Sequence, residues 1–527
     1  HLVAPGCRYG YDLVAHVGLE SFLFGRRLQG IHENLRAEGL SIDIPTSSLD
    51  ELRRRFLFYL GQVHRQAAPV LRESLSQADS RTWLIDGTLE PGTPVFFGVQ
   101  DAASAILLGC WKIPTENADA MAPCLEEMAH DHGQPDRILH DLSNAMSLAC
   151  QRSLPDVPHD VCHFHFVRDV GEGLLTQPQK TLSNRLRSLK LQVRLREQRK
   201  TQTEWLREHD GGPEAELTLQ QLLRGEPLTV TWSESLGREV LFAFHYWMLD
   251  YAADGKRQGF PFDPYSLYFH RRLIRGHDAL GRLLSRPAVK AHAPKTLFNL
   301  FDQLQRYRMD PQIIAAAAHC ETAFREFDRL RTTLRLCADG ASPMRHGYDL
   351  PVNQWHQVRG ELDVLRDDYR QRIECCSDHV ERSVCDTILS HIEKYLPQLL
   401  PPTEQEHDNV RTTNQLEGHW GEAKRACRQT QGRRKLTRSF DALPAELMLL
   451  PNLRNPKYVD IVLDGSLDNL ATKFAEANST GNSYASWRQT NTSLNIGRVP
   501  SRILRQPDFV EQVTEVYDDH GRAEHRR

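Results

Sequence analysis

The hydrophobic periodicity changes after residue 80, and that change restricts the fold more than any other feature. Four short apolar runs, at 82–85, 95–99, 105–110 and 137–140, have the length and bounding turns of β-strands, and 160–164 is a fifth. A segment of helical periodicity at 117–132 separates the third run from the fourth. Three strands in succession, then helix, strand, helix and strand, predict a mixed five-stranded α/β sheet.

The residues before the sheet have helical periodicity interrupted by a turn. The turn lies at Gly39–Leu40, and a second helix begins at Thr46 behind Pro45. This pattern is typical of a helix-turn-helix, whose second helix enters the major groove of DNA, but a three-helix packing unit without DNA contacts produces it equally well. The residues expected on the exposed side of the second helix are Ser47, Ser48, Glu51 and Arg54.

Residues 170–410 are predicted to be helical nearly throughout. An apolar stripe from Val358 to Val384 predicts one long amphipathic helix, ended by Pro401 and Pro402. The strongly apolar runs, such as 313–318, are far shorter than the ~18 residues of a membrane-spanning helix, which argues against a transmembrane transporter. Eleven cysteines without paired C-x-x-C motifs argue against a disulfide framework and favour reduced, cytosolic thiols.

The chain as a whole is not basic, since 65 lysines and arginines face 69 aspartates and glutamates for a formal charge of −4. Two local stretches are strongly basic: residues 181–200 contain a single acid, and residues 424–438 contain none. Such stretches either bind phosphate groups or keep a helix face in water. The cations expected to contact phosphate are Arg185, Arg187, Lys190, Arg194, Lys424, Arg425, Arg428, Arg433, Arg434 and Lys435.

Two aspartates end predicted strands of the same sheet. Asp86 follows the run 82–85, and Asp141 follows the run 137–140. A buried carboxylate is costly unless it is paired or bound to a metal, and Mg²⁺ takes carboxylate oxygens as ligands. The alternative is structural: Asp141 caps a helix that begins at Leu142, and Asp86 anchors a turn before Gly87.

A third acid favours the metal site over the structural interpretation. Glu417 precedes Lys424 by seven residues, and Arg428 follows four residues later, so the three share one helical face. A carboxylate beside two cations suits a site where metal ions and a phosphodiester meet.

Four short motifs occur in a specific order. They are Asp-Gly-Thr from Asp86, Asp-Leu-Ser-Asn-Ala from Asp141, Cys-His-Phe-His at 162–165 on the predicted fifth strand, and Thr-Asn-Gln-Leu-Glu ending at Glu417. Together they resemble the DDE transposases with an RNase H-like fold, in particular the prokaryotic insertion-sequence enzymes related to the Mutator-like and hAT groups. Cys162 and His165 are similar to the C/DxxH signature of those superfamilies. The resemblance covers about 80–170 and 410–435, and the helical middle looks like their all-α insertion.

The resemblance implies an RNase H-like core interrupted by a large insertion. The expected regions are an N-terminal helical DNA-binding region at 1–78, the first part of the core at 79–170, the all-α insertion at 171–408, the second part of the core at 409–440 and a C-terminal region at 441–527. Cys162 and His165 are expected to support the site from behind the acids, although thiolate and imidazole also suit zinc.

The activity that the resemblance implies is two-metal phosphoryl transfer. Asp86, Asp141 and Glu417 would hold two Mg²⁺ ions, for which Mn²⁺ substitutes, and the enzyme would nick element ends and join the freed 3′-OH to target DNA. The implied partners are double-stranded DNA, at the terminal repeats and at the target, and further copies of the chain. The implied location is the cytoplasm, at the nucleoid.

Two other functions remain open. The chain would be a domesticated DNA-binding protein if it kept the fold without the activity, although three intact acids argue against this. It would be a nuclease of the RNase H superfamily if it cut DNA without strand transfer.

Overall fold

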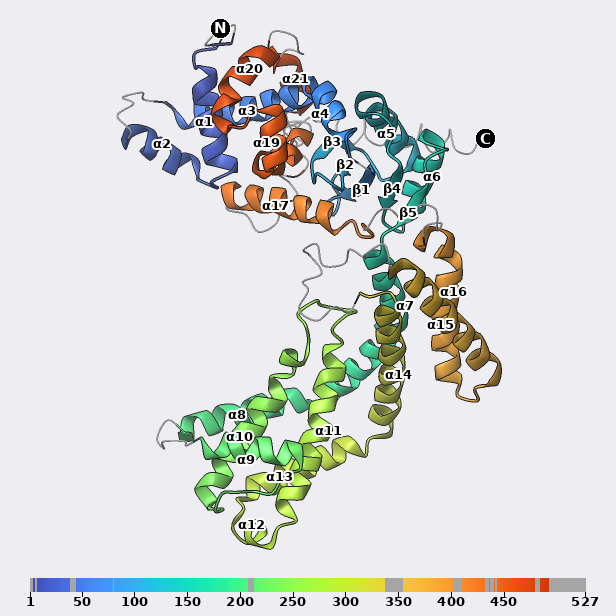
Figure 1. Cartoon of the computed structure of the whole chain (residues 1–527). Coiled ribbons are helices and arrows are strands. Elements are labelled where there is room, and N and C mark those ends of the chain that lie inside the picture. The colour runs from blue at the N-terminus through green and yellow to red at the C-terminus, as the bar shows by residue number, and fades with distance from the viewer. Residues whose placement is uncertain are drawn as a thin grey trace, which may run out of the picture. The chain divides into compact units, whose positions relative to one another are not determined.

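The computed structural model describes residues 3–4, 7–37, 44–78, 80–206, 213–336, 354–400, 410–431, 436, 440, 443–478 and 484–491. The protein is mostly helical and contains a five-stranded mixed sheet of order β3-β2-β1-β4-β5 (Figure 1). The chain divides into two compact units. Residues 1–160 and 412–527 form the first, here called the sheet unit, and residues 161–411 form the second, the helical unit.

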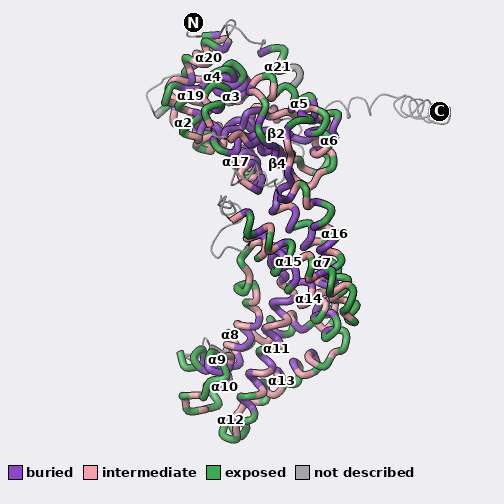
Figure 2. The backbone as a smooth tube through the Cα atoms, turned by 45° about the vertical axis from the view of Figure 1, so that its right-hand side comes forward, coloured by how far each residue is buried: buried purple, intermediate pink, exposed green. Residues whose placement is uncertain are grey.

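The first four strands occur where the sequence predicts them, whereas the fifth shares only Asp160 and Val161 with the predicted run 160–164. They are β1 (Thr82–Thr88), β2 (Val95–Asp101), β3 (Leu107–Ile113), β4 (Arg137–His140) and β5 (His159–Val161). Strand β1 pairs antiparallel with β2 and parallel with β4. Strands β2 and β4 are buried along their whole length (Figure 2). The prediction of a mixed five-stranded sheet is therefore confirmed.

Helices from both ends of the chain cover this sheet. Those before and within it are α1 (Tyr11–Phe22), α2 (Leu28–Ala37), α3 (Thr46–Gln66), α4 (Ala68–Leu75), α5 (Ala118–His132) and α6 (Asn144–Ser153). Those after residue 412 are α17 (Asn414–Gln431), the 3₁₀ helices η4 (Ala445–Arg454) and η5 (Leu467–Asn469), α19 (Pro456–Val462), α20 (Leu470–Asn478) and α21 (Tyr484–Asn491).

The two segments of the sheet unit share one core. The ring of Phe474 on α20 lies 5.6 Å from that of Phe56 and 5.5 Å from that of Tyr59, both on α3. The Asn452 side chain accepts from the Leu107 backbone N–H and donates to the Leu107 carbonyl, each at 2.9 Å. The segment after residue 412 therefore completes the fold that the first 160 residues begin.

Helix α3 is mainly a core helix. Every residue from Phe56 to His64 is buried, so its exposed side chains lie before and after this stretch. Of the residues expected on an exposed recognition face, Ser47 and Arg54 are exposed, whereas Ser48 and Glu51 are half-buried. The exposed part of the expected DNA-reading face thus lies in the first half of α3.

The helical unit is built almost entirely of helices. They are α7 (His163–Ser188), α8 (Leu191–Leu206), α9 (Glu214–Arg224), α10 (Glu234–Leu249), η1 (Tyr251–Asp254), α11 (Tyr265–Leu284), α12 (Pro287–His292), α13 (Lys295–Arg308), α14 (Pro311–Thr333), α15 (Trp355–Cys375) and α16 (His379–Leu399). The unit begins at residue 161 rather than at the expected 171, because α7 starts directly after the short strand β5. None of the described helices has the length and apolar character needed to cross a bilayer.

The single long helix predicted across Val358–Val384 is wrong. The helix breaks after Cys375, and Asp378 starts a new one by accepting hydrogen bonds from the backbone N–H groups of Val380 and Glu381. The apolar stripe continues on both helices because α15 and α16 pack against each other. The N-cap formed by the Asp378 side chain therefore ends the continuous helix that the apolar periodicity predicts.

Candidate active site

Asp86 and Asp141 occupy equivalent positions on neighbouring strands. Strands β1 and β4 run parallel, with Leu84 opposite Leu139, and continuing this register by two residues places Asp141 opposite Asp86. Neighbouring strands lie about 4.8 Å apart, and opposite residues of a parallel pair point to the same face. Asp141 directly follows β4, as the sequence predicts. Strand β1 instead continues through Gly87 to Thr88, so Asp86 lies inside this strand and neither ends it nor anchors a turn.

Asp141 does not cap the helix that follows it. Helix α6 begins at Asn144, and its N-cap is Ser143, whose side chain accepts from the Met146 N–H. Asp141 Oδ1 accepts the Ser143 backbone N–H at 2.7 Å, which holds the turn between β4 and α6. The Oδ2 atom of Asp141 accepts no hydrogen bond from the described part of the chain, so this carboxylate keeps an oxygen for another partner.

Helix α17 is anchored over the sheet by Trp420. The indole Nε1–H donates to Asp86 Oδ2 at 2.9 Å, and both side chains are buried. The ring lies against Gly98, the cross-strand partner of Asp86 on β2. A Cβ at position 98 would come within 2.4 Å of the Trp420 Cη2 atom, so this close approach requires glycine.

Helical geometry places Glu417 on one flank of Trp420. At about 100° per residue, His419 falls roughly 100° to one side of Trp420 and Glu417 roughly 60° to the other. The His419 Nδ1 atom lies 3.1 Å from Gln100 Nε2 on β2, whereas Lys424, on the Glu417 flank, reaches the segment that follows β1. Glu417 therefore lies on the side of α17 turned away from β2. The start of this helix is buried, as the low exposure of Thr413 and Asn414 shows.

The two cations of this helix meet an acid that follows β1. The Lys424 Nζ atom donates to the Leu89 carbonyl at 3.1 Å and lies 3.7 Å from Glu90 Oε1, and the Arg428 guanidinium lies 3.4 Å from the same oxygen. Burial lowers the pKa of the Lys424 amine, and the Glu90 charge opposes that shift. These contacts confirm that Lys424 and Arg428 share a face directed at the end of β1.

Glu116 is a fourth acid at this end of the sheet, and the sequence analysis missed it. Its Oε2 atom is 3.6 Å from where a Cβ of Gly87 would be, on the face of β1 opposite the Asp86 side chain. Burial raises the pKa of Glu116, the negative charge of Asp141 raises it further, and hydrogen bonding to Ser143 lowers it. Glu116 lies in the loop after β3, where no strand or helix pattern draws attention to it.

The acids fit a magnesium site by chemistry, but the described arrangement is open. Within the described ranges, no three His, Cys, Asp or Glu side chains stand close enough to form a preformed metal cluster. Asp86, Asp141 and Glu417 supply only carboxylate oxygens, the donors that Mg²⁺ prefers.

The Cys-x-x-His motif does not lie on a strand. Strand β5 ends at Val161, Cys162 is the N-cap residue of α7, and His165 lies in the first turn of that helix. His163 already belongs to the helix, and its Nε2 atom donates to the Leu399 carbonyl of α16 at 2.6 Å, which holds the start of α7 in place. Both motif residues belong to the helical unit. A supporting role behind the acids stays a prediction.

The predicted phosphate-binding cations differ in how far they are committed to internal partners. Arg425 on α17 is exposed, and Arg54 on α3 pairs with Asp50 at 3.1 Å. In the helical unit, Arg185 forms a two-pronged ion pair with Asp310, and Arg187 bonds Asn184 at 3.2 Å. The exposed cations of this set in the helical unit are Arg187, Lys190 and Arg194. The cations that lie outside the described residues are Arg433, Arg434 and Lys435.

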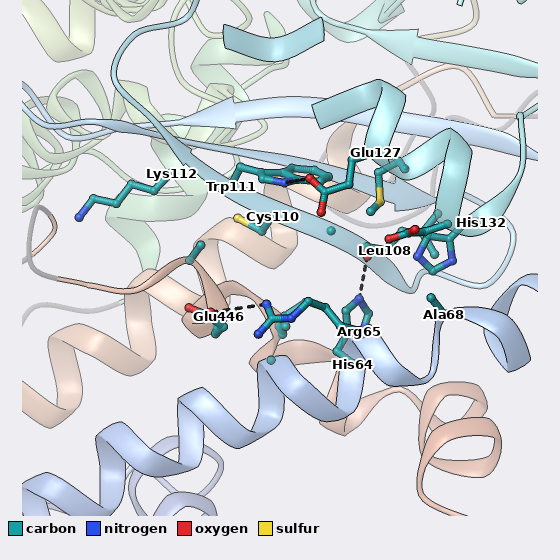
Figure 3. A pocket seen from close by; sticks show the side chains of 16 residues that line it. His64, Arg65, Ala68, Leu108, Cys110, Trp111, Lys112, Glu127, His132 and Glu446 are labelled. Atoms are coloured by element: carbon teal, nitrogen blue, oxygen red, sulfur yellow. Dashed lines mark hydrogen bonds and ion pairs between the residues drawn. The ribbon is translucent and has the colours of Figure 1, made fainter. Parts of the chain in front are cut away.

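A cavity of the sheet unit lies away from the acids, along the outer edge of β3 (Figure 3). Its volume is about 370 Å³, and its walls come from α3, β3, α5 and η4. His64 and His132 are buried in its lining, and burial lowers the pKa of each to about 4. None of Asp86, Asp141 and Glu417 lines this cavity.

No known protein-family model matches the chain, and no curated protein shows significant similarity to it.

Proposed function

We propose that the protein is a DNA transposase of an insertion sequence, with an RNase H-like core split by an all-α insertion. The observation that carries the proposal is the convergence of Asp86, Asp141 and α17 in one unit. Asp86 and Asp141 come from neighbouring parallel strands, and α17, bearing Glu417, returns across an intervening unit of residues 161–411 to bond Asp86 through Trp420.

The sheet order 3-2-1-4-5 and the interruption by a helical unit support the proposed core. In an RNase H-like core, an aspartate on the first strand, an aspartate after the fourth and an acid on a later helix form the site. Asp86, Asp141 and Glu417 stand at these positions. Of the residues expected to read DNA on α3, Ser47 and Arg54 are exposed and so available to a duplex.

The proposed cofactor is a pair of Mg²⁺ ions, with Mn²⁺ as a substitute. Asp86, Asp141 and Glu417 would hold them. Bound there, the ions would activate the attacking water or 3′-OH and neutralise charge on the scissile phosphate. The chain's own residues position the acids, and Arg425 on the same helix as Glu417 attracts the DNA backbone.

The proposed partners are double-stranded DNA at the element ends and at the target, together with further copies of the chain. Each copy carries one set of acids, so two element ends call for at least two copies. The proposed location is the cytoplasm, at the nucleoid.

Two other functions compete with this one. An RNase H-superfamily nuclease would cut DNA but would not join a 3′-OH to a second duplex. A domesticated DNA-binding protein would bind DNA but would not cut it, and the open arrangement of the acids among the described residues is the observation that favours it.

The test is Mg²⁺-dependent nicking and joining of duplex DNA taken from the flanks of the gene. We expect the wild type to nick the repeat and transfer the 3′-OH, and Glu417→Gln to do neither. Glu422→Gln is the matched control, because Glu422 lies on the same helix but is exposed and pairs with Arg454 at 3.4 Å. Nicking without joining would identify a nuclease, and DNA binding without nicking would overturn the enzyme proposal.

A further inference from the structure

The bond between Trp420 and Asp86 links two chain segments at the proposed site. The indole belongs to α17 and the carboxylate to β1, and the Nε1–Oδ2 distance is 2.9 Å. Asp86 is 7 % exposed and Trp420 is 3 % exposed, so water competes little for this hydrogen bond. A hydrogen bond to an ionised group in such surroundings is among the stronger ones in proteins.

Contacts of α17 with β2 orient the Trp420 indole toward Asp86. The ring atoms nearest to Gly98 are Cη2 and Cζ2, and Cζ2 lies on the same edge of the indole as Nε1. Gly98 is opposite Asp86 in the β1–β2 pair, so the ring that covers Gly98 points its N–H at the neighbouring carboxylate. On the other side of the helix, His419 contacts Gln100, two residues further along β2. These contacts fix the rotation of α17 about its axis.

We propose that Trp420 is a positioning residue that orients the Asp86 carboxylate for the metal ions and sets the rotation of α17 that presents Glu417. This role rests on the proposed function. A carboxylate rotates about its last bond, and a directed N–H favours one orientation. Groups that hydrogen-bond to metal-binding side chains from outside typically raise metal affinity about 10–100-fold.

A purely structural role makes a different prediction. Buried indole N–H groups and buried carboxylates both need partners, and this bond satisfies both. If that were its whole purpose, replacing Trp420 would change stability and leave cation affinity unchanged. Cation affinity measured without DNA therefore separates the two roles.

The experiment measures Mn²⁺ binding to the full chain by titration calorimetry, with unfolding followed in parallel. Trp420→Phe keeps a ring over Gly98 and removes the donor, and we expect its dissociation constant for Mn²⁺ to rise about 10–100-fold. Trp111→Phe is the matched control, because the Trp111 indole also donates to a carboxylate, Glu127 Oε2, at 2.9 Å in the same unit. We expect it to bind Mn²⁺ as the wild type does.

A folded Trp420→Phe chain with wild-type Mn²⁺ affinity would overturn the role of Trp420 and leave the proposed function standing. A wild-type chain that binds no Mn²⁺ and cuts no DNA would overturn the proposed function, and this role with it. If Trp420→Phe fails to fold, NMR spectra of the indole N–H groups of the wild type are used in its place. The Trp420 signal is identified as the indole N–H resonance that shifts in Asp86→Asn. We expect this signal to shift when Mg²⁺ is added to the wild type, and a signal unaffected by saturating Mg²⁺ would overturn the proposal.

Discussion

The two units of the protein are built in opposite ways. The helical unit is one continuous stretch, residues 161–411, whose helices pack on neighbours in the same stretch. The sheet unit is assembled from residues 1–160 and 412–527, and its core holds aromatic rings from both, such as Phe56 and Phe474. The candidate active site lies in the discontinuous unit, with Asp86 and Asp141 from the first segment and Glu417 from the second.

This difference shows how the acids depend on the fold. The positions of Asp86 and Asp141 relative to each other are set by the register of β1 and β4, which belong to the same segment of the chain. Glu417 takes its place only when the second segment returns and Trp420 bonds Asp86. Assembly of the proposed site is therefore coupled to closure of the sheet unit, and we expect the helical unit, which is one continuous stretch, to form without it.

The largest expected effect comes from deleting one core ring in each unit. Phe474→Ala in the sheet unit and Phe327→Ala in the helical unit each remove a fully buried ring, at a cost of about 3–5 kcal/mol. Hydrogen exchange followed by mass spectrometry should show reduced protection in α3 and β1 for the first variant, and in α7 and α14 for the second. Reduced protection in both units from either variant would contradict their independence.

The sequence was sufficient for features that are local, and insufficient for those that depend on distant segments. The strands, and the place of Asp141 directly after β4, follow from apolar runs of the right length. Glu116 and the bond from Trp420 were missed, because a loop residue and a contact between a helix and a distant strand leave no periodic signal. The prediction of one long helix at 358–384 was wrong, because the N-cap at Asp378 starts a new helix within the apolar stripe.

The next largest effect is a change in stability on replacing a glycine by alanine, compared at one position in each unit. Gly98→Ala would place a Cβ 2.4 Å from the Trp420 ring, and such overpacking costs about 1–3 kcal/mol. Gly173 is exposed on α7, and a Cβ added there would meet no atom within 4 Å, so Gly173→Ala should stabilise the helical unit by about 0.5–1 kcal/mol. Denaturant unfolding measures both changes. A neutral Gly98→Ala would mean that the ring is not held against β2.

Acid should weaken each unit through a buried neutral histidine. Burial lowers the pKa of His64 in the sheet unit and of His245 in the helical unit to about 4. As the pH falls below about 6.5, these histidines are therefore protonated in the unfolded chain before they are in the folded one. Because this favours unfolding, each histidine should lower the free energy of unfolding of its unit by about 2 kcal/mol between pH 7 and pH 5.

Replacing one histidine should flatten the pH dependence of one unit. His64→Gln keeps an N–H donor for the Leu108 carbonyl, which His64 Nε2 bonds at 2.7 Å, but does not titrate. We expect the sheet unit of this variant to keep its stability at pH 5 better than the wild type, and His245→Gln to do the same for the helical unit. Unfolding monitored unit by unit at pH 7 and pH 5 checks this, and an unchanged slope for both variants would contradict it.

The smallest expected effect is on the salt dependence of DNA binding, and it shows which unit contacts DNA. Removing one cation that binds a phosphate lowers the slope of log affinity against log salt by about 0.9, so Arg425→Ala on α17 should reduce the slope by about that amount. Arg194→Ala makes the same test of the helical unit, where Arg194 is exposed. Arg185 is already committed to Asp310, so Arg185→Ala should leave the slope unchanged. Binding of a labelled duplex over a range of salt concentrations measures all three. Equal effects of Arg425→Ala and Arg185→Ala would mean that internal ion pairs open on DNA binding, and no effect of Arg425→Ala would place the DNA away from the Glu417 helix.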